Sequence, residues 1–341
     1  MGSSLEPKIK SKKENRMKKE LGISVILVVL CIVVAILNPR FLSGANLQNT
    51  ARLIGMYGIF SIGVGVVIIT GGIDLSVGSM FALLGVFLYY MLVQWALPWP
   101  VAVMFIILAA LLLGFFHGFL VTKVKLQPFV VTLCGLLLYR GIARYIAKEQ
   151  TCGFGYCEGF ETLQKVATGK FLTIPMPFIF LIIVGLVMWI VLHRSIYGRY
   201  LFAVGRNEEA ARFSGINTTA IIASAYIVSA LLAGVGAILL AFYTNSIAPS
   251  SHGSFYELYA IAAAVLGGCS LRGGHGSVLG IIIGATLLQV LRNLVNLLGI
   301  PSSLDLAVMG TVILVGVITD QILKQRSEKM RLSSDRSTAE K

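Results

Sequence analysis

One long uncharged stretch, interrupted by a single carboxylate, limits most strongly what this chain can fold into. Among the 70 residues from 53 to 122, only Asp74 is a charged residue. Apolar runs of this kind are typical of bilayer-crossing helices, each of which needs about 20 apolar residues. A charge at bilayer depth costs roughly 2.5–3.5 kcal/mol. Asp74 should therefore face the protein interior or an aqueous path.

The overall composition agrees with a membrane protein. Of 341 residues, 57% are hydrophobic and 13% are charged, whereas soluble domains average about 25% charged residues. A water-soluble globular protein is excluded on this ground. The net charge of +13 does not indicate a nucleic-acid partner, because the basic residues flank apolar segments: seven lie in the first 20 residues and six follow Gln321. Such flanks are typical of cytoplasmic ends.

Hydropathy predicts an all-α polytopic membrane protein of about ten transmembrane helices. With the basic N terminus in the cytoplasm, ten spans return the C terminus to the same side. That arrangement places 20 of the 28 Lys and Arg residues on the cytoplasmic side, as the positive-inside rule requires. The predicted spans are 21–37, 52–70, 76–96, 100–122, 127–147, 173–192, 220–243, 256–268, 276–298 and 304–322.

The chain is expected to form one membrane domain between two polar tails. No signal-peptide cleavage site follows the first apolar segment, so we predict that this segment is retained as a helix. The membrane domain is predicted to cover 21–323, with a basic N-terminal tail at 1–20 and a C-terminal tail at 324–341. Both tails are expected to be cytoplasmic and disordered.

Two glycine-rich segments of the chain have similar sequences. GGIDLSVGS runs from Gly71 to Ser79, and GGCSLRGGHGS runs from Gly267 to Ser277. Each starts with two glycines, ends in Gly-Ser and precedes an apolar span, so each predicts a helix interruption facing the cytoplasm. Matching interruptions are typical of transporters built from duplicated halves, and chance among 36 glycines is the alternative.

The longest predicted cytoplasmic loop, 194–219, contains a short helix signal. Residues 208–212 favour a helix and a glycine can end it. The loop contains the pattern Glu-Ala-Ala-x-x-x-Gly, which resembles the segment by which permeases of bacterial ATP-binding-cassette importers dock on their ATPases. The candidate docking residues are Glu208, Glu209, Ala210, Ala211 and Gly215.

Taken with the two glycine-rich segments, residues 20–322 resemble a permease of the ribose-type sugar importer family. The resemblance implies a permease in the bacterial inner membrane that imports a monosaccharide, a ribose-like pentose or a hexose, by alternating access. It also implies an ATPase partner that binds and hydrolyses ATP, an external substrate-binding protein and a second permease subunit. The chain itself would be no enzyme and would need no cofactor. The outer loop 148–172 and the basic N-terminal extension depart from the family pattern.

Asp74 and Ser76 are candidates for the substrate path, and each has a structural alternative. A carboxylate or hydroxyl at a helix interruption can accept backbone N–H groups of the next helix. The rival class, an ion- or proton-coupled secondary transporter, would use Asp74 as its coupling carboxylate. Within the importer class, a nucleoside or a signalling molecule is the alternative solute.

A polar face is predicted on the ninth span. Its members are spaced i, i+3, i+4 and i+7, so they share one side of a helix. Such groups can replace the water lost by sugar hydroxyls, or they can join neighbouring helices. Its charged member is expected to reach the outer interface, a carboxylate or a central cavity. The residues are Gln289, Arg292, Asn293 and Asn296.

Two further pairs are candidates near the outer surface. Arg140 and Arg144 either extend to the interface or form a seat for the binding protein. Cys152 and Cys157 lie in the predicted outer loop and are candidates for a disulfide. His117 is isolated in the sequence and is expected to be structural or interfacial. No cluster with metal-ligand spacing occurs in the sequence, so no metal site is predicted.

Overall fold

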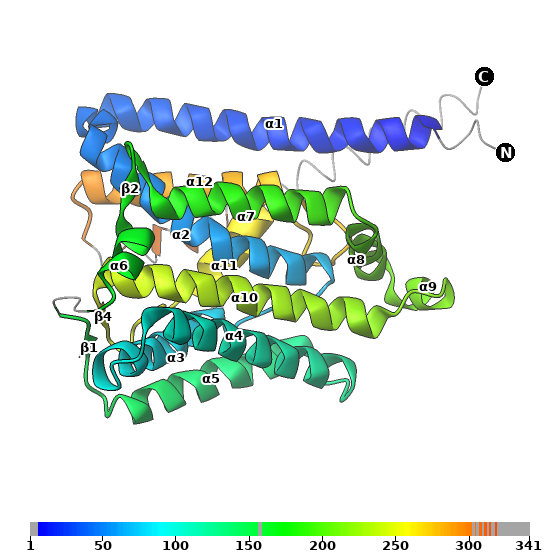
Figure 1. Ribbon diagram of the computed structural model, residues 1–341. Helices are drawn as coiled ribbons and strands as arrows, with labels where there is room; N and C mark the ends of the chain where they lie inside the picture. Colours follow the sequence, from blue (N-terminus) through cyan, green and yellow to red (C-terminus); the bar gives the residue numbers. More distant parts are fainter. Residues whose placement is uncertain are drawn as a thin grey trace, which may run out of the picture.

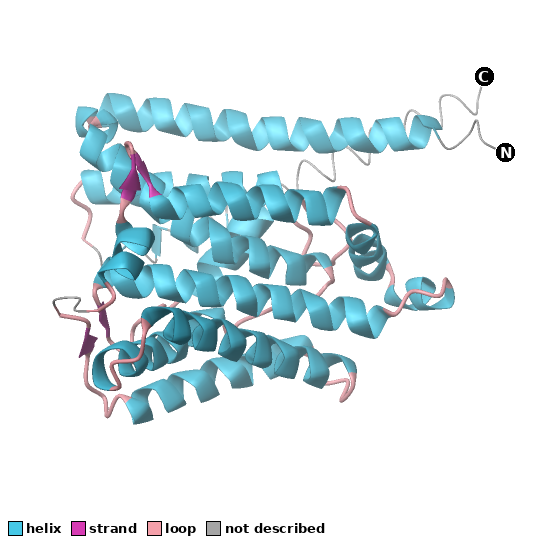
Figure 2. Cartoon of the chain, in the orientation of Figure 1, coloured by secondary structure: helices cyan, strands magenta, loops and turns pink. Residues whose placement is uncertain are grey.

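The computed structural model describes residues 6–155 and 159–301, together with residues 304, 307, 308, 310, 311, 314 and 318, and side chains from residue 21 onward. The described part is a helical bundle with two small two-stranded sheets (Figure 1, Figure 2). The helices are α1 (Glu6–Leu37), α2 (Gly44–Ile69), α3 (Val77–Tyr89), α4 (Trp99–Thr122), α5 (Pro128–Ile146), α6 (Glu161–Thr168), α7 (Met176–His193), α8 (Ile196–Arg206), α9 (Glu208–Phe213), α10 (Thr218–Thr244), α11 (Tyr256–Leu266) and α12 (Val278–Leu297). The strands are β1 (Cys152–Gly153), β2 (Lys170–Phe171), β3 (Ile174–Pro175) and β4 (Ser246–Ile247), with β1 paired to β4 and β2 to β3.

Seven of the described helices are long and apolar enough to cross a membrane. Two shorter apolar helices, at Leu21–Leu37 and Tyr256–Leu266, account for two more predicted spans. The all-α fold class is confirmed. The tenth predicted span, 304–322, and the tail 324–341 fall largely or wholly outside the described residues.

The disorder expected for residues 1–20 is wrong from Glu6 onward, because α1 begins there and runs without interruption into the first span.

The bundle is organised around two buried helices, α2 and α10. The apolar windows of α2 and α10 are 89% and 78% buried, against 22% in α4 and 28% in α5 and α7. Close helix contact in lipid depends on small residues. A Cβ at Gly63 would lie 3.0 Å from Cα of Ser229, and one at Gly114 would lie 2.7 Å from the carbonyl oxygen of Tyr226. Glycine therefore lets α2 and α4 approach the backbone of α10.

The two long loops lie at opposite ends of the bundle. Helices α8 and α9, from the loop 194–219, are at one end, and the sheets β1–β4 and β2–β3 are at the other (Figure 1). The described start of α1 lies toward the same end as α9. This separation agrees with the predicted placement of 194–219 and 148–172 on opposite sides of the membrane.

Both glycine-rich segments interrupt helices, as predicted. After α2, Gly71 has φ +85° and the chain re-enters a helix at Val77; after α11, Gly268 has φ +89° and the chain re-enters at Val278. These positive φ angles are readily accessible only to glycine. The two segments differ in their caps, because Ser277 caps α12 by accepting the N–H of Gly280, whereas Ser76 makes no such bond to α3.

A labelling experiment tests which end is cytoplasmic. Leu172 lies between β2 and β3, Phe213 ends α9, and these elements are at opposite ends of the bundle. The two side chains have similar exposed fractions, 86% and 80%. In a variant without other cysteines, we expect Leu172→Cys to react with a membrane-impermeant maleimide in sealed cells and Phe213→Cys to react only after permeabilisation. The reverse pattern, or equal labelling in sealed cells, would contradict the predicted orientation.

Candidate functional site

Helix α9 forms an exposed projection at one end of the bundle (Figure 1). Asn207 caps it by accepting the N–H of Ala210 at 2.9 Å, and Glu208 and Glu209 occupy its first turn, where acidic side chains stabilise a helix. Both glutamates are exposed, as is Phe213. The helix predicted within 194–219 is confirmed, and its first-turn glutamates and its aromatic side chain lie at the surface.

The end of α9 depends on Gly215. This residue has φ +82°, and its N–H donates to the carbonyl of Arg212 at 3.0 Å. A Cβ at this position would meet no heavy atom within 4 Å. Gly215 is therefore required because the turn needs a positive φ angle, and not because a larger side chain would clash with a neighbour. Ala211 is buried and its carbonyl accepts the N–H of Ile216, which fixes the exit of the chain toward α10.

A junction of backbone atoms connects α8 to both helix interruptions. A Cβ at Gly205 in α8 would overlap the carbonyl oxygen of Ile69 at the end of α2 and would lie 2.7 Å from the backbone nitrogen of Gly274. The N–H of Gly274 in turn donates to the carbonyl of Ile69 at 2.8 Å. A Cβ at Gly273 would lie 2.9 Å from the nitrogen of Gly71. We call Ile69, Gly71, Gly205, Gly273 and Gly274 the glycine junction.

Asp74 lies in the first interruption and is completely buried. One carboxylate oxygen accepts the backbone N–H of Ser76 at 3.1 Å and its hydroxyl at 2.6 Å; the other accepts the hydroxyl of Ser229 in α10 at 2.8 Å. This is the arrangement of a carboxylate that forms a turn with Ser76 just before α3 and ties this turn to α10. Lining of a path by Asp74 or Ser76 stays a prediction.

His117 is part of the same buried network, although no partner for it was predicted from the sequence. Its Nδ1 lies 3.5 Å from the hydroxyl of Ser76, and its Nε2 lies 2.8 Å from the hydroxyl of Tyr139 in α5. The chain of contacts from Asp74 to Tyr139 therefore joins α3, α4 and α5. The tertiary partners of His117 lie 41 residues before it and 22 after it, so no local pattern indicates them.

The polar face predicted on α12 is present, and three of its members lie inside the bundle. Gln289 is buried, Arg292 and Asn293 are half-buried, and Asn296 is exposed. Arg292 donates to the hydroxyl of Tyr57 at 2.8 Å.

An aromatic cluster surrounds the guanidinium of Arg292. The guanidinium carbon lies 6.0 Å from the ring centre of Tyr57 and 5.5 Å from that of Tyr259, within the range of cation–π attraction. The ring centre of Tyr256 is 4.8 Å from that of Tyr57. Sequence reasoning missed these tyrosines, although their hydroxyls in apolar helices could have indicated a site. We call Tyr57, Phe60, Phe81, Tyr256, Tyr259 and Arg292 the aromatic–arginine cluster.

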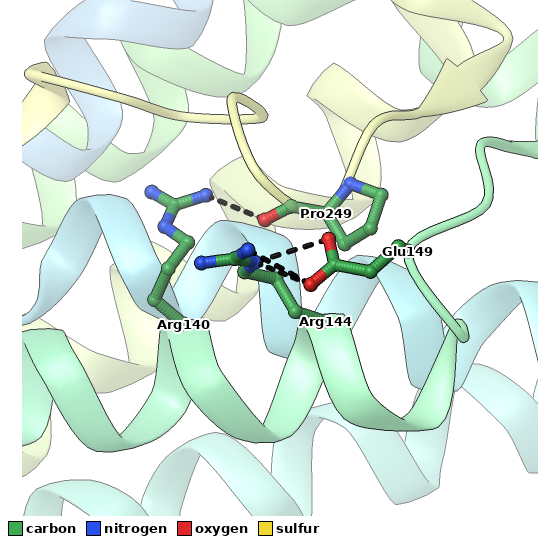
Figure 3. A network of polar contacts seen from close by, with 4 residues as sticks. All are labelled: Arg140, Arg144, Glu149 and Pro249. Atoms are coloured by element: carbon green, nitrogen blue, oxygen red, sulfur yellow. Dashed lines mark hydrogen bonds and ion pairs between the residues drawn. The ribbon is translucent and has the colours of Figure 1, made fainter.

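Arg140 and Arg144 have different partners, although both lie on α5 (Figure 3). Arg140 turns inward and donates to the carbonyls of Pro249 at 3.1 Å, His252 at 2.6 Å and Gly78 at 3.3 Å. It thereby holds the segment between α10 and α11 against α3. Burial and the nearby Arg140 lower the pKa of His252 to about 4, so its ring is neutral at pH 7.

Arg144 remains on the surface and pairs with Glu149, with 2.8 Å between guanidinium and carboxylate. Both side chains are about half exposed, so the pair adds little stability. A docking role for either arginine stays a prediction, and of the two only Arg144 presents its charge at the surface.

The proposed disulfide is not tested by the structure. Cys152 lies on β1 and is buried, and this burial raises the pKa of its thiol. Cys157 lies outside the described residues. Within the described ranges, no group of three or more His, Cys, Asp or Glu side chains could hold a metal ion.

Comparison with known proteins agrees with the features above. Residues 46–317 match the family model described as the permease component of branched-chain amino acid transport systems. The ribose import permease protein RbsC of Bacillus subtilis is 38% identical over 312 residues, which cover 89% of this chain and 93% of the relative. The corresponding protein of Escherichia coli K12 is 37% identical over 87% of this chain and 92% of its own length.

A more distant relative is the autoinducer 2 import system permease protein LsrD of Salmonella paratyphi A. It is 29% identical over 327 residues, which cover 95% of this chain and 98% of the relative. No solved structure was found to match the chain.

Proposed function

The chain belongs to the family of membrane permease components matched over residues 46–317, and from this membership we propose that it imports a monosaccharide into the bacterial cytoplasm. It is the inner-membrane subunit of an ATP-binding-cassette importer, and the solute is a ribose-like pentose or a hexose. The observation that carries the proposal is the identity of 37–38% with ribose import permeases over nearly the whole chain.

ATP hydrolysis is assigned to a cytoplasmic partner, which docks on α9. The exposed Glu208, Glu209 and Phe213 support this role, because they give a short helix both charge and an apolar anchor. An external binding protein delivers the solute, and a second permease subunit completes the translocation path. The chain carries out no bond-making chemistry and needs no cofactor in this mechanism.

Alternating access requires that α9 moves with the ATPase and that the movement reaches the spans. The glycine junction supports such a route, because α8 contacts the ends of both interrupted helix pairs through backbone atoms. Transport then follows from two states of the bundle that differ in affinity for the ATPase with and without ATP.

The rival mechanism is ion- or proton-coupled transport through Asp74. Both oxygens of this carboxylate accept hydrogen bonds from Ser76 or Ser229, which supports a structural role instead. Among solutes, a signalling molecule of the autoinducer 2 class is the second candidate, favoured by one observation, the 29% identity with LsrD. The higher identity with ribose permeases favours the monosaccharide.

Reconstitution tests the proposal. The tagged chain is purified from its own membranes together with its ATPase, placed in proteoliposomes and supplied with its binding protein and radiolabelled D-ribose. We expect uptake that requires ATP and the binding protein. Uptake driven by a proton gradient without ATP would favour the secondary transporter, and ATP-dependent uptake of autoinducer 2 without ribose would favour the second solute.

A further inference from the structure

Near the start of α2, its interface with α12 contains polar side chains from both helices. On α2, Asn46, Thr50 and Tyr57 are spaced i, i+4 and i+11, which places them within about 40° of one another around the helix. On α12, Gln289, Arg292 and Asn293 share the facing side. We call these six residues the polar seam.

Two inter-helix pairs connect the sides of the polar seam. The amides of Asn46 and Asn293 bond reciprocally, with nitrogen–oxygen distances of 3.0 and 2.7 Å. Further along α2, the hydroxyl of Tyr57 accepts from the guanidinium of Arg292 at 2.8 Å. These pairs satisfy four of the six side chains and hold α2 against α12.

The remaining two side chains have polar atoms without a partner. The hydroxyl oxygen of Thr50 and the amide oxygen of Gln289 are both buried and make no hydrogen bond. Their exposed fractions are 5% and 4%. Thr50 lies on the α2 face between Asn46 and Tyr57, and Gln289 lies one helical turn from Arg292 and Asn293.

Buried polar atoms are nearly always hydrogen-bonded, because leaving one unpaired costs free energy. Two unpaired atoms on one polar seam therefore require an explanation other than helix packing. Apolar residues of the same shape at positions 50 and 289 would pack the closed interface with less penalty. The buried hydroxyl and amide at these positions indicate a partner that is present in another state of the protein.

We propose that the polar seam is a subsite for the hydroxyl groups of a neutral monosaccharide, with Thr50 and Gln289 as its direct ligands. This inference rests on the proposed function. When α2 and α12 separate during the transport cycle, the sugar hydroxyls bond to these two side chains and exchange with the Asn46–Asn293 pair. The sugar thereby keeps hydrogen bonds in place of the water it loses.

The aromatic–arginine cluster supports a sugar as the ligand. It adjoins the polar seam through Tyr57 and Arg292, which belong to both groups. Tyr57, Tyr256 and Tyr259 provide apolar ring surfaces with hydroxyl groups at their edges, which suits the mixed apolar and polar surface of a sugar ring. The guanidinium supplies several donors in fixed geometry.

Two single substitutions, one on each helix of the polar seam, test the proposal in the reconstituted importer. Thr50→Val and Gln289→Met remove the unpaired oxygens while nearly keeping side-chain volume. Each is expected to lower the rate of D-ribose uptake roughly tenfold, because one hydrogen bond to the solute is lost. Each is also expected to raise the thermal midpoint of the purified complex, because a buried unpaired atom disappears from the closed interface.

Two control variants accompany them. Thr50→Ser keeps the hydroxyl and is expected to retain most of the uptake. Thr286→Val removes a hydroxyl on α12 that already bonds to the carbonyl of Ile282 at 2.8 Å, and it should leave uptake unchanged. The combination of lower uptake with higher thermal stability distinguishes a ligand role from a structural one.

The possible results separate the two proposals. Wild-type rates of ribose uptake in Thr50→Val and Gln289→Met would overturn the subsite and leave the importer function intact. A fall in uptake together with a lower thermal midpoint would make the two residues structural and would also overturn the subsite. If the wild-type complex takes up neither D-ribose nor a hexose in the presence of ATP and the binding protein, the proposed function fails and the subsite fails with it.

Discussion

Replacing Gly215 by proline is expected to reduce ATP-coupled uptake about a hundredfold, a loss equivalent to roughly 2.8 kcal/mol of docking free energy. Gly215 has φ +82°, whereas proline is restricted to φ near −65°, and proline also removes the N–H that donates to Arg212. The exit of α9 must then change direction. Because α9 is exposed, membrane abundance should stay normal. Uptake, ATP hydrolysis and immunoblotting of the membrane fraction measure the three quantities.

Glu209→Arg is expected to have a similar effect by another route. The substitution reverses a charge on the exposed first turn of α9 and opposes the helix dipole there. Gly215→Ala is the matched control, since a Cβ at this position meets no heavy atom within 4 Å and the change costs only about 1–2 kcal/mol of backbone strain. Uptake near the wild-type rate in Gly215→Pro and Glu209→Arg would show that α9 is a passive linker.

Gly205→Ala is expected to destabilise the protein by about 3 kcal/mol, at the upper end of the range for overpacked sites. The added methyl group would overlap the carbonyl oxygen of Ile69, and the backbone nitrogen of Gly274 blocks the adjacent space. Neither is the flexible end of a side chain, and the two atoms bond to each other. We expect a lower thermal midpoint in detergent and less protein in the membrane.

Gly141→Ala is the control for this experiment. Gly141 lies within α5, a Cβ there would contact nothing within 4 Å, and alanine favours a helix. Its thermal midpoint should equal or exceed that of the wild type. If Gly205→Ala retains the wild-type midpoint, α8 does not press against α2 as closely as the structure describes.

Local sequence patterns predicted the parts of the molecule that depend on neighbouring residues. The helix at α9 follows from helix-favouring residues before a glycine, and the shared face of Gln289, Arg292 and Asn293 follows from their spacing. The two helix interruptions likewise follow from paired glycines. In each case the physical cause lies within a few positions along the chain.

Partners distant in the sequence could not be predicted in this way. Arg140 was expected at the lipid interface or a docking surface, yet its guanidinium bonds to carbonyls 109 and 112 residues away. The contact of Arg292 with Tyr57 spans 235 residues. Such contacts arise from helix packing, which one sequence without an alignment does not specify. The helical N-terminal segment was missed because its residues are mostly charged or polar.

The glycine junction has a mechanical consequence. Side chains between two helices act as a soft layer, since each can change rotamer and absorb part of a displacement. Where Gly205 meets the backbone of Ile69 and Gly274, no such layer exists. A displacement of α8 is therefore transmitted to the end of α2 and to the α11–α12 connection with little reduction in its size. The glycine junction is therefore a rigid backbone contact between α8 and both helix interruptions. We expect the two interruptions to move at the same time when α8 moves.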